Sequence, residues 1–128
     1  MILKGRTIAS GKVKGECLVT KQPISFFGGV DPETGIVIEK GHELEGKCIA
    51  DKVLVFPHGK GSTVGTYTIY RLKKNNKAPA AMVLAECEAI VAAGAILSEI
   101  PCVDKVRIGK IKNGMFVTVD ADKAKVIF

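Results

Sequence analysis

The segment His58–Thr63 is the part of this 128-residue chain whose residue types and spacing are best suited to chemistry. Ser62 supplies a hydroxyl, and Gly59 and Gly61 allow a tight, exposed loop before it. If a helix begins at this serine, the hydroxyl lies beside free backbone N–H groups at the positive end of the helix dipole. Such a place suits an anion or a reacting group, so Ser62 is the first candidate for a catalytic residue.

The flanking residues predict the elements that would position this segment. Val53–Phe56 is apolar at every position, as in a strand covered on both faces, and Pro57 ends the strand because proline lacks a backbone N–H. Between Val64 and Leu72 the apolar residues recur at roughly helical spacing, and Ser62 is a favoured N-cap residue. The sequence therefore predicts a strand, a loop and a helix, with Ser62 where the loop meets the helix.

Two familiar catalytic motifs do not fit this loop. The nucleotide-binding pattern G-x-x-x-x-G-K-[ST] is missing, because Lys60 stands between two glycines and no other glycine has the required spacing. Ser62 also lies outside any G-x-S-x-G motif, which argues against a serine hydrolase. His58, four residues from Ser62, could serve as a base, but no carboxylate is evident to orient it, so we interpret it as a loop or structural histidine.

Composition narrows the classes of function. The chain has 19 Lys and Arg against 13 Asp and Glu, and the net charge of +6 favours a small anionic substrate or an acidic partner. That charge and the scarcity of aromatic residues argue against nucleic-acid binding. No apolar run approaches the roughly 20 residues of a membrane span, and the first residues lack the apolar core of a signal peptide. We expect one soluble, cytoplasmic domain that does not bind a membrane.

The cysteines do not predict a metal site. They are four in number, lie far apart and form no C-x-x-C pair: Cys17, Cys48, Cys87 and Cys102. In a domain with an adequate core, free cysteines of this kind are typically small buried hydrophobic residues. The expectation is therefore that this chain binds no metal or iron–sulfur cluster by itself.

The order of predicted elements is β-rich, then strand–helix–strand–helix, then β-rich again. The further strands are expected at Met1–Ala9, Glu16–Thr20, Ile36–Ile38, Pro79–Ala85, Val106–Ile108, Met115–Val119 and Lys125–Ile127, with a helix at Glu86–Ala93 that Gly94 ends and a hairpin turn at Asn113-Gly114. This order predicts a single α/β domain with two helices on a mixed sheet and the terminal strands as a second layer. Ligands usually bind at the carboxyl ends of such strands, where the Ser62 loop would project.

Two other segments each allow two interpretations. Phe26 and Phe27 precede a Gly pair, and this apolar loop either packs in the core or covers a site or interface. The basic stretch Arg71–Lys77 either complements the negative end of the helix dipole or docks an acidic partner.

Several stretches resemble one known family. They are HGKGSTVGTY (58–67), the preceding VLVFP (53–57), APAAMVLAECEAIVAAGAILSEIP (78–101) and LKGRTIASGKVKGECLVTKQPISFFGGVDPETG (3–35). They resemble the small subunits of the archaeal aconitase-X group, the phosphomevalonate dehydratases, over essentially the whole chain. The resemblance implies that residues 1–128 form the swivelling β/β/α domain of aconitase-type enzymes.

This resemblance also implies an activity. The family forms heterodimers in which the large subunit supplies the iron–sulfur cluster, [4Fe-4S], and most of the substrate site, while the small subunit contributes a serine. The serine of the family's G-S-T motif falls at Ser62, as proton acceptor in the dehydration of (R)-5-phosphomevalonate to trans-anhydromevalonate 5-phosphate. Gly59, Lys60, Gly61 and Thr63 are then expected to support the loop or to contact substrate.

Three alternatives remain open at this point. Related aconitase-X proteins dehydrate cis-3-hydroxy-L-proline, and substrate choice should lie mainly in the large subunit. The phosphohistidine swivelling domain has a similar architecture, but it needs a histidine at the helix start, where this chain has Ser62 and Thr63. A non-catalytic scaffold subunit would tolerate loss of the serine.

Overall fold

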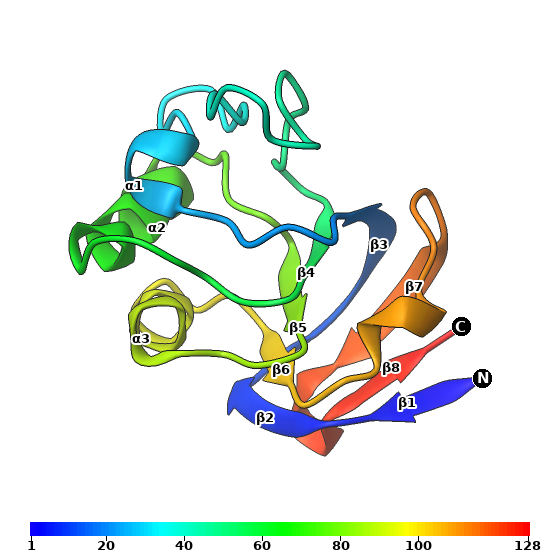
Figure 1. Cartoon of the computed structure of the whole chain (residues 1–128). Coiled ribbons are helices and arrows are strands. Elements are labelled where there is room, and N and C mark those ends of the chain that lie inside the picture. The colour runs from blue at the N-terminus through cyan, green and yellow to red at the C-terminus, as the bar shows by residue number, and fades with distance from the viewer.

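The computed structural model describes residues 1–128, which form one eight-stranded sheet and three α-helices (Figure 1). The strands are β1 (Ile2–Lys4), β2 (Arg6–Ala9), β3 (Lys12–Val19), β4 (Val53–Phe56), β5 (Ala81–Leu84), β6 (Cys102–Asp104), β7 (Phe116–Asp120) and β8 (Lys125–Ile127). The helices are α1 (Phe26–Gly29), α2 (Val64–Lys74) and α3 (Ala89–Leu97), with 3₁₀ turns η1 (Ile108–Lys110) and η2 (Ala121–Lys123).

The sheet has a parallel and an antiparallel part. Its strand order is β1-β8-β7-β3-β4-β5-β6-β2, in which β3, β4, β5 and β6 run parallel and the other pairs are antiparallel. The connections from β4 to β5 and from β5 to β6 pass through α2 and α3, which lie on the same face of the sheet (Figure 1). The predicted α/β class, with helices on a mixed sheet, is confirmed.

The two edge strands of the sheet are consecutive in the chain. Only Gly5 separates β1 from β2, and its N–H donates to the carbonyl of Ala124 at 2.8 Å. A Cβ on Gly5 would lie 2.3 Å from the backbone oxygen of Asp104, so only glycine fits where the chain passes from one edge to the other. The antiparallel strands thereby curl around one side of the parallel strands (Figure 1). They form the expected second layer, as a continuation of the same sheet.

Every residue of β4 and β5 is buried, because two cores cover their opposite faces. Leu54 and Phe56 of β4 point to the core under the helices, where Phe26 packs edge-on against Phe56 with ring centroids 5.9 Å apart. Val53 and Val55 point to the core enclosed by the antiparallel strands. This arrangement confirms the interpretation of Val53–Phe56 as a strand covered on both sides.

The helix predicted at Glu86–Ala93 is displaced, and the role expected for Gly94 is wrong. The helix α3 begins at Ala89 and continues to Leu97, so Gly94 lies inside it. A Cβ on Gly94 would come within 2.7 Å of Ile69 Cδ1 on α2. The glycine is therefore explained by the close approach of two helices, which local sequence does not reveal.

Three smaller predictions near the chain's loops are corrected. Ile36–Ile38 makes only isolated bridges, and Val106–Ile108 lies after β6 and leads into η1. The turn at Asn113-Gly114 consequently joins no hairpin, since β7 pairs with β3. Instead, Asn113 Oδ1 accepts the Val19 N–H at 3.0 Å.

Three of the four cysteines are buried as expected, whereas Cys48 is exposed. Burial raises the pKa of the Cys17 thiol to about 11. The pKa of Cys102 is also raised, by its hydrogen bond with Cys87 and then by burial. The thiols of Cys17 and Cys102 are therefore held in the protonated, unreactive form.

Candidate functional site

The loop that contains Ser62 follows the carboxyl end of β4 and leads into α2, as predicted. His58, Lys60 and Ser62 are exposed, whereas Gly59 is buried. The Ser62 hydroxyl is therefore accessible to a molecule outside the chain.

The start of α2 differs in one detail from the prediction. Thr63 is the residue at the N-cap position and its side chain makes no cap, while the Ser62 hydroxyl accepts the Val64 N–H at 3.1 Å. The backbone N–H groups of Ser62 and Thr63 donate to no protein atom, and the first turn of α2 contains no acidic residue. Two donors and the positive end of the helix dipole are thus free to stabilise negative charge at Ser62.

A neighbouring segment holds the loop through backbone contacts. Ile24 forms a parallel bridge with Gly59, its N–H donates to the His58 carbonyl at 3.2 Å, and its carbonyl accepts the Lys60 N–H at 3.0 Å. Ile24 is itself buried in the core under the helices. The loop is therefore anchored to the core although it belongs to no regular strand.

The two glycines of the loop allow close approach to this chain's own residues. A Cβ on Gly59 would lie 2.5 Å from both Glu88 Oε1 and Val91 Cγ2 at the start of α3. Gly61 has φ of +99°, and a Cβ there would lie 2.6 Å from Ser25 Oγ. Contact with another subunit is thus not needed to explain either glycine.

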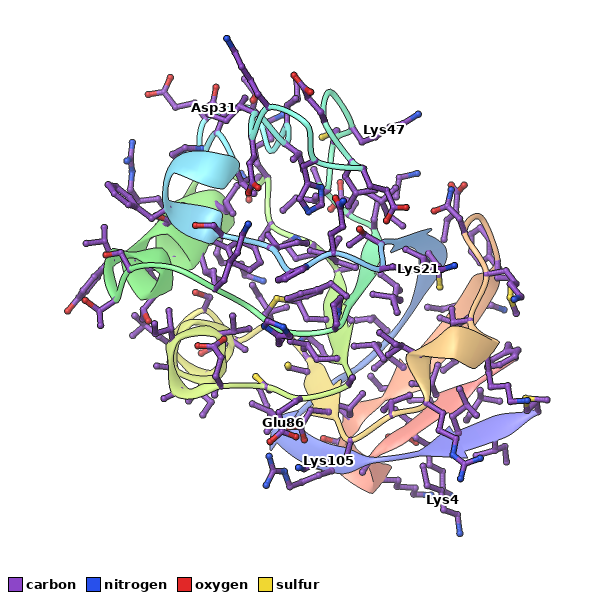
Figure 2. All side chains as sticks on the ribbon, in the orientation of Figure 1. Lys4, Lys21, Asp31, Lys47, Glu86 and Lys105 are labelled. Atoms are coloured by element: carbon purple, nitrogen blue, oxygen red, sulfur yellow. The ribbon has the colours of Figure 1, made fainter.

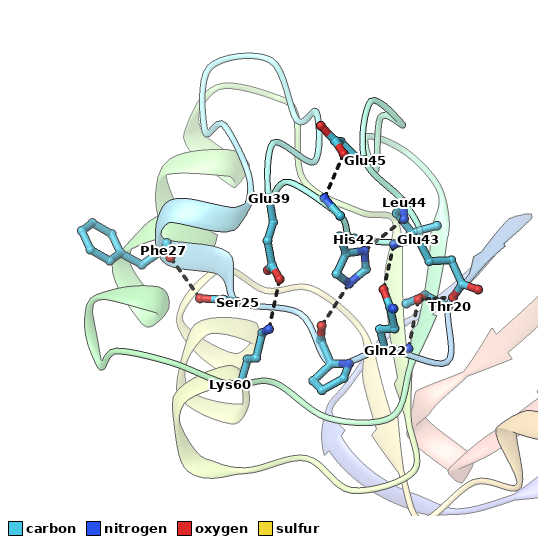
Figure 3. Close-up of polar contacts among 12 residues, drawn as sticks. Thr20, Gln22, Ser25, Phe27, Glu39, His42, Glu43, Leu44, Glu45 and Lys60 are labelled. Atoms are coloured by element: carbon cyan, nitrogen blue, oxygen red, sulfur yellow. Dashed lines mark hydrogen bonds and ion pairs between the residues drawn. The ribbon is translucent and has the colours of Figure 1, made fainter.

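Lys60 is paired with an acidic residue from a distant segment. Its Nζ lies 3.1 Å from Glu39 Oε2, and the two side chains are 44% and 31% exposed. Figure 3 shows the two side chains pointing toward each other between the Ser62 loop and the segment above it. Sequence reasoning missed Glu39, because 21 residues separate the partners and no motif links them.

The segment that carries Glu39 is fixed by a hydrogen-bond network around His42 (Figure 3). His42 is buried, its Nε2 lies 3.0 Å from the Pro23 carbonyl, and its Nδ1 accepts the Leu44 N–H at 3.0 Å. Beside it, the Glu43 carboxylate accepts hydrogen bonds from the Thr20 hydroxyl and from a backbone N–H, which hold its pKa below the ordinary value. Because both ring nitrogens of His42 have hydrogen-bond partners within the chain, we interpret His42 as structural.

His58 makes no hydrogen bond with Ser62. Its Nδ1 lies 2.8 Å from the carbonyl of Gly59, the adjacent residue. Because the imidazole and the serine hydroxyl are not hydrogen-bonded, the geometry gives no support to a Ser–His pair.

Large apolar side chains are exposed beside the Ser62 loop. Phe27 is 53% exposed, and its ring extends away from the ribbon (Figure 3), while its neighbour Phe26 is buried. Val64 and Tyr67, in the first turns of α2, are 42% and 65% exposed. Core packing, the first of the two interpretations, is therefore right for Phe26. Phe27 lies on the surface.

No group of three or more His, Cys, Asp or Glu side chains is arranged to hold a metal ion. None of the helices combines the length and the apolar composition that crossing a membrane requires.

Residues 2–128, which include the whole sheet and the Ser62 loop, match the family described as the aconitase X swivel domain. The chain belongs to the aconitase X swivel-domain family. Similar proteins include the phosphomevalonate dehydratase small subunit of Thermococcus kodakarensis, 60% identical over 126 residues that cover 98% of this chain and 95% of the relative. The subunit of the same name from Methanosarcina acetivorans is 55% identical, with 97% and 88% covered.

Solved structures of similar proteins agree with this membership of the aconitase X family. The crystal structure of Thermococcus kodakaraensis aconitase X in its holo form has a TM-score of 0.98 at 58% identity, and covers 99% of this chain and 97% of that one. The solution NMR structure of a UPF0107 protein has a TM-score of 0.91 at 45% identity, with 100% and 99% covered. The predicted swivelling α/β fold is confirmed.

Proposed function

We propose that this chain is the small subunit of a heterodimeric hydro-lyase that dehydrates (R)-5-phosphomevalonate to trans-anhydromevalonate 5-phosphate. The relatives are named as small subunits of phosphomevalonate dehydratase, and this name supports both the substrate and the presence of a second, larger subunit. The observation that carries the proposal is the exposed Ser62 hydroxyl at the open start of α2. We assign the reaction to a modified archaeal mevalonate pathway.

Ser62 is proposed as the proton acceptor of this elimination. In a dehydration a C–H bond and the neighbouring C–O bond break and a C=C bond forms. Here Ser62 takes the proton while the hydroxide leaves separately, and the two are lost as water overall once the serine gives up its proton. An ordinary serine hydroxyl is a poor base, so it must act with a strongly lowered pKa or as the alkoxide. The free N–H groups of Ser62 and Thr63 and the dipole of α2 supply that stabilisation.

The chain is proposed to provide half of an active site. Ser62 lies on an exposed loop, and a large subunit that carries most of the substrate site would have to cover it. The exposed Phe27, Val64 and Tyr67 support a contact there, because large apolar side chains gathered beside a site are typical of interfaces. The net charge of +6 favours a small anionic substrate.

This chain's residues do not fit an iron–sulfur cluster, since no group of three or more His, Cys, Asp or Glu side chains is arranged to hold a metal ion. We therefore assign the [4Fe-4S] cluster of such a dehydratase to the large subunit, where it would act on the leaving hydroxyl. In this proposal Ser62 of this chain takes the substrate's proton, and the exposed apolar side chains beside it contact the large subunit.

The test is co-expression of this chain with its large subunit under anaerobic conditions, followed by assays of the purified complex. We expect turnover of phosphomevalonate, no turnover by either subunit alone, and little or none of cis-3-hydroxy-L-proline. Activity of the isolated chain would contradict the proposal that it provides only half of an active site. Preference for cis-3-hydroxy-L-proline would contradict the proposed substrate but would agree with the proposed reaction class, dehydration.

A further inference from the structure

We propose that Glu39 is a positioning residue of this site, which holds the side chain of Lys60, two residues before Ser62, in the orientation that receives the anionic group of the substrate. This inference rests on the proposed function and extends it to a residue that is distant in sequence. Glu39 acts through Lys60 and does not itself contact the substrate.

Glu39 is well placed to direct Lys60, because its own backbone is fixed. Its N–H donates to the Gly29 carbonyl at 3.3 Å, and its carbonyl accepts the His42 N–H at 3.2 Å. Its other carboxylate oxygen, Oε1, lies 3.3 Å from where a Cβ on Gly29 would be, so the side chain lies against the end of α1. About two-thirds of the side chain is covered, since 31% of it is exposed.

Lys60 is the only cationic residue between Pro57 and Thr63, and it stands two positions before Ser62. An ammonium group has three N–H donors, so one can stay with Glu39 while the others contact a phosphate or carboxylate. A free lysine samples many rotamers, and an anion that binds it must bear the cost of ordering it. A lysine already held by Glu39 avoids most of that cost.

The pair is not explained by stability alone. Both partners are partly exposed, and ion pairs of that kind contribute little to folding. The loop is already anchored without it, through the backbone contacts of Ile24 with His58, Gly59 and Lys60. What the ion pair adds is the direction of the lysine side chain.

The experiment compares the heterodimer carrying Glu39→Gln with the wild-type complex. We expect KM for phosphomevalonate to rise about three- to thirtyfold, with kcat within about twofold and thermal stability unchanged. Lys60→Met should raise KM at least as much, and adding Glu39→Gln to it should have no further effect. Glu33→Gln is the matched control, because it removes the same charge from an exposed glutamate that forms no ion pair.

Three results would overturn the inference. A lower KM in Glu39→Gln would mean that Glu39 competes with the substrate for Lys60. Additive effects of the two substitutions would mean that Glu39 does not act through Lys60. A joint fall of kcat and stability would assign Glu39 a merely structural role.

A second readout separates this inference from the proposed function. In NMR spectra of the isolated chain that detect Lys60 Nζ through its carbon-bound hydrogens, the Nζ chemical shift should change in Glu39→Gln and stay the same in Glu33→Gln. If the wild-type complex does not turn over phosphomevalonate, the function fails whatever this spectrum shows. If the complex is active but neither KM nor the Nζ chemical shift responds to Glu39→Gln, the inference alone fails.

Discussion

Two strand-to-helix junctions lie side by side in this domain and are built differently. The junction between β5 and α3 is closed by carboxylates: Glu88 is the N-cap of α3 and accepts the N–H groups of Ile90 and Val91 at 3.0 and 3.3 Å. The N–H of Cys87 donates to Asp104 Oδ2 at 2.8 Å. The positive end of α3 is therefore satisfied by the chain itself.

The junction between β4 and α2 is open. No carboxylate caps α2: the Ser62 hydroxyl accepts the Val64 N–H, and the backbone carbonyls of Ser62 and Thr63 accept the next two N–H groups of the helix. The two junctions touch, because Gly59 of the open one packs against Glu88 of the closed one. The closed junction is capped by the chain itself and packs against the open one, whose Ser62 and Thr63 N–H groups have no acceptor within the chain.

The largest expected effect is on catalysis at the open junction. Ser62→Ala should lower kcat of the heterodimer about 10²- to 10⁴-fold, because it removes the proposed proton acceptor. The free energy of unfolding should fall by about 1 kcal/mol or less, the value of one hydroxyl contact at a helix start. Steady-state kinetics and chemical denaturation measure the two quantities.

The control for this prediction is Ser10→Ala, the same change at an exposed serine that precedes β3, far from the Ser62 loop in the chain. It should leave both quantities unchanged. Near-normal turnover of Ser62→Ala in an assembled heterodimer would remove the functional difference between the junctions.

The second prediction concerns the contact between the junctions. Gly59→Ala would press its methyl group against Glu88 Oε1 and Val91 Cγ2, each 2.5 Å away. Val91 is buried and β-branched, so Glu88 must move and weaken its cap. We expect a loss of about 1–3 kcal/mol in the free energy of unfolding. In a Glu88→Ala background the loss should be smaller, and full additivity would show that the junctions are independent.

The third prediction tests the closed junction through pH. Burial acts to raise the pKa of Asp104, but hydrogen bonds from Arg6 and from the Cys87 N–H outweigh it and hold the pKa below its ordinary value of 3.8. A lowered pKa contributes stability that is complete above the unfolded value and is lost as pH falls through the folded value. Asp104→Asn should cost about 1–3 kcal/mol near neutral pH and flatten the decline of stability in acid.

Urea denaturation at several pH values below 6 measures this effect. The control is Glu86→Gln, which removes the exposed ion pair with Lys105 near the same junction (Figure 2). Loss of an exposed pair should change stability little. An unchanged acid slope in Asp104→Asn would show that Asp104 does not hold the closed junction.

The sequence predicted what depends on local pattern. The apolar run Val53–Phe56 and the helical spacing after Val64 are set within a few residues, and both elements were found where expected. The place of Ser62 at the carboxyl end of β4 follows from these two elements. The one local error there is the N-cap, which is Thr63, because both residues are of types that favour this position.

Contacts between distant segments were not predictable in the same way. The pairing of Ile24 with Gly59 and that of Glu39 with Lys60 depend on how the long connection from β3 to β4 folds back over the loop. The local sequence predicts that Gly94 ends a helix, because nothing in it shows that Ile69 lies against this glycine. Such contacts are set by packing of the whole domain, which periodicity does not encode.

The smallest expected effect comes from the cap of the closed junction. Glu88→Ala removes the acceptor of the Ile90 and Val91 N–H groups, and caps of this kind contribute about 1 kcal/mol to the free energy of unfolding. Glu88→Gln should lose less, because its amide oxygen still accepts while the favourable charge at the helix start is lost. Both variants should keep turnover of the heterodimer within about twofold, since the closed junction supplies no reacting group. A large loss of kcat in Glu88→Gln with normal stability would place Glu88 in the reaction and overturn the division of roles between the two junctions.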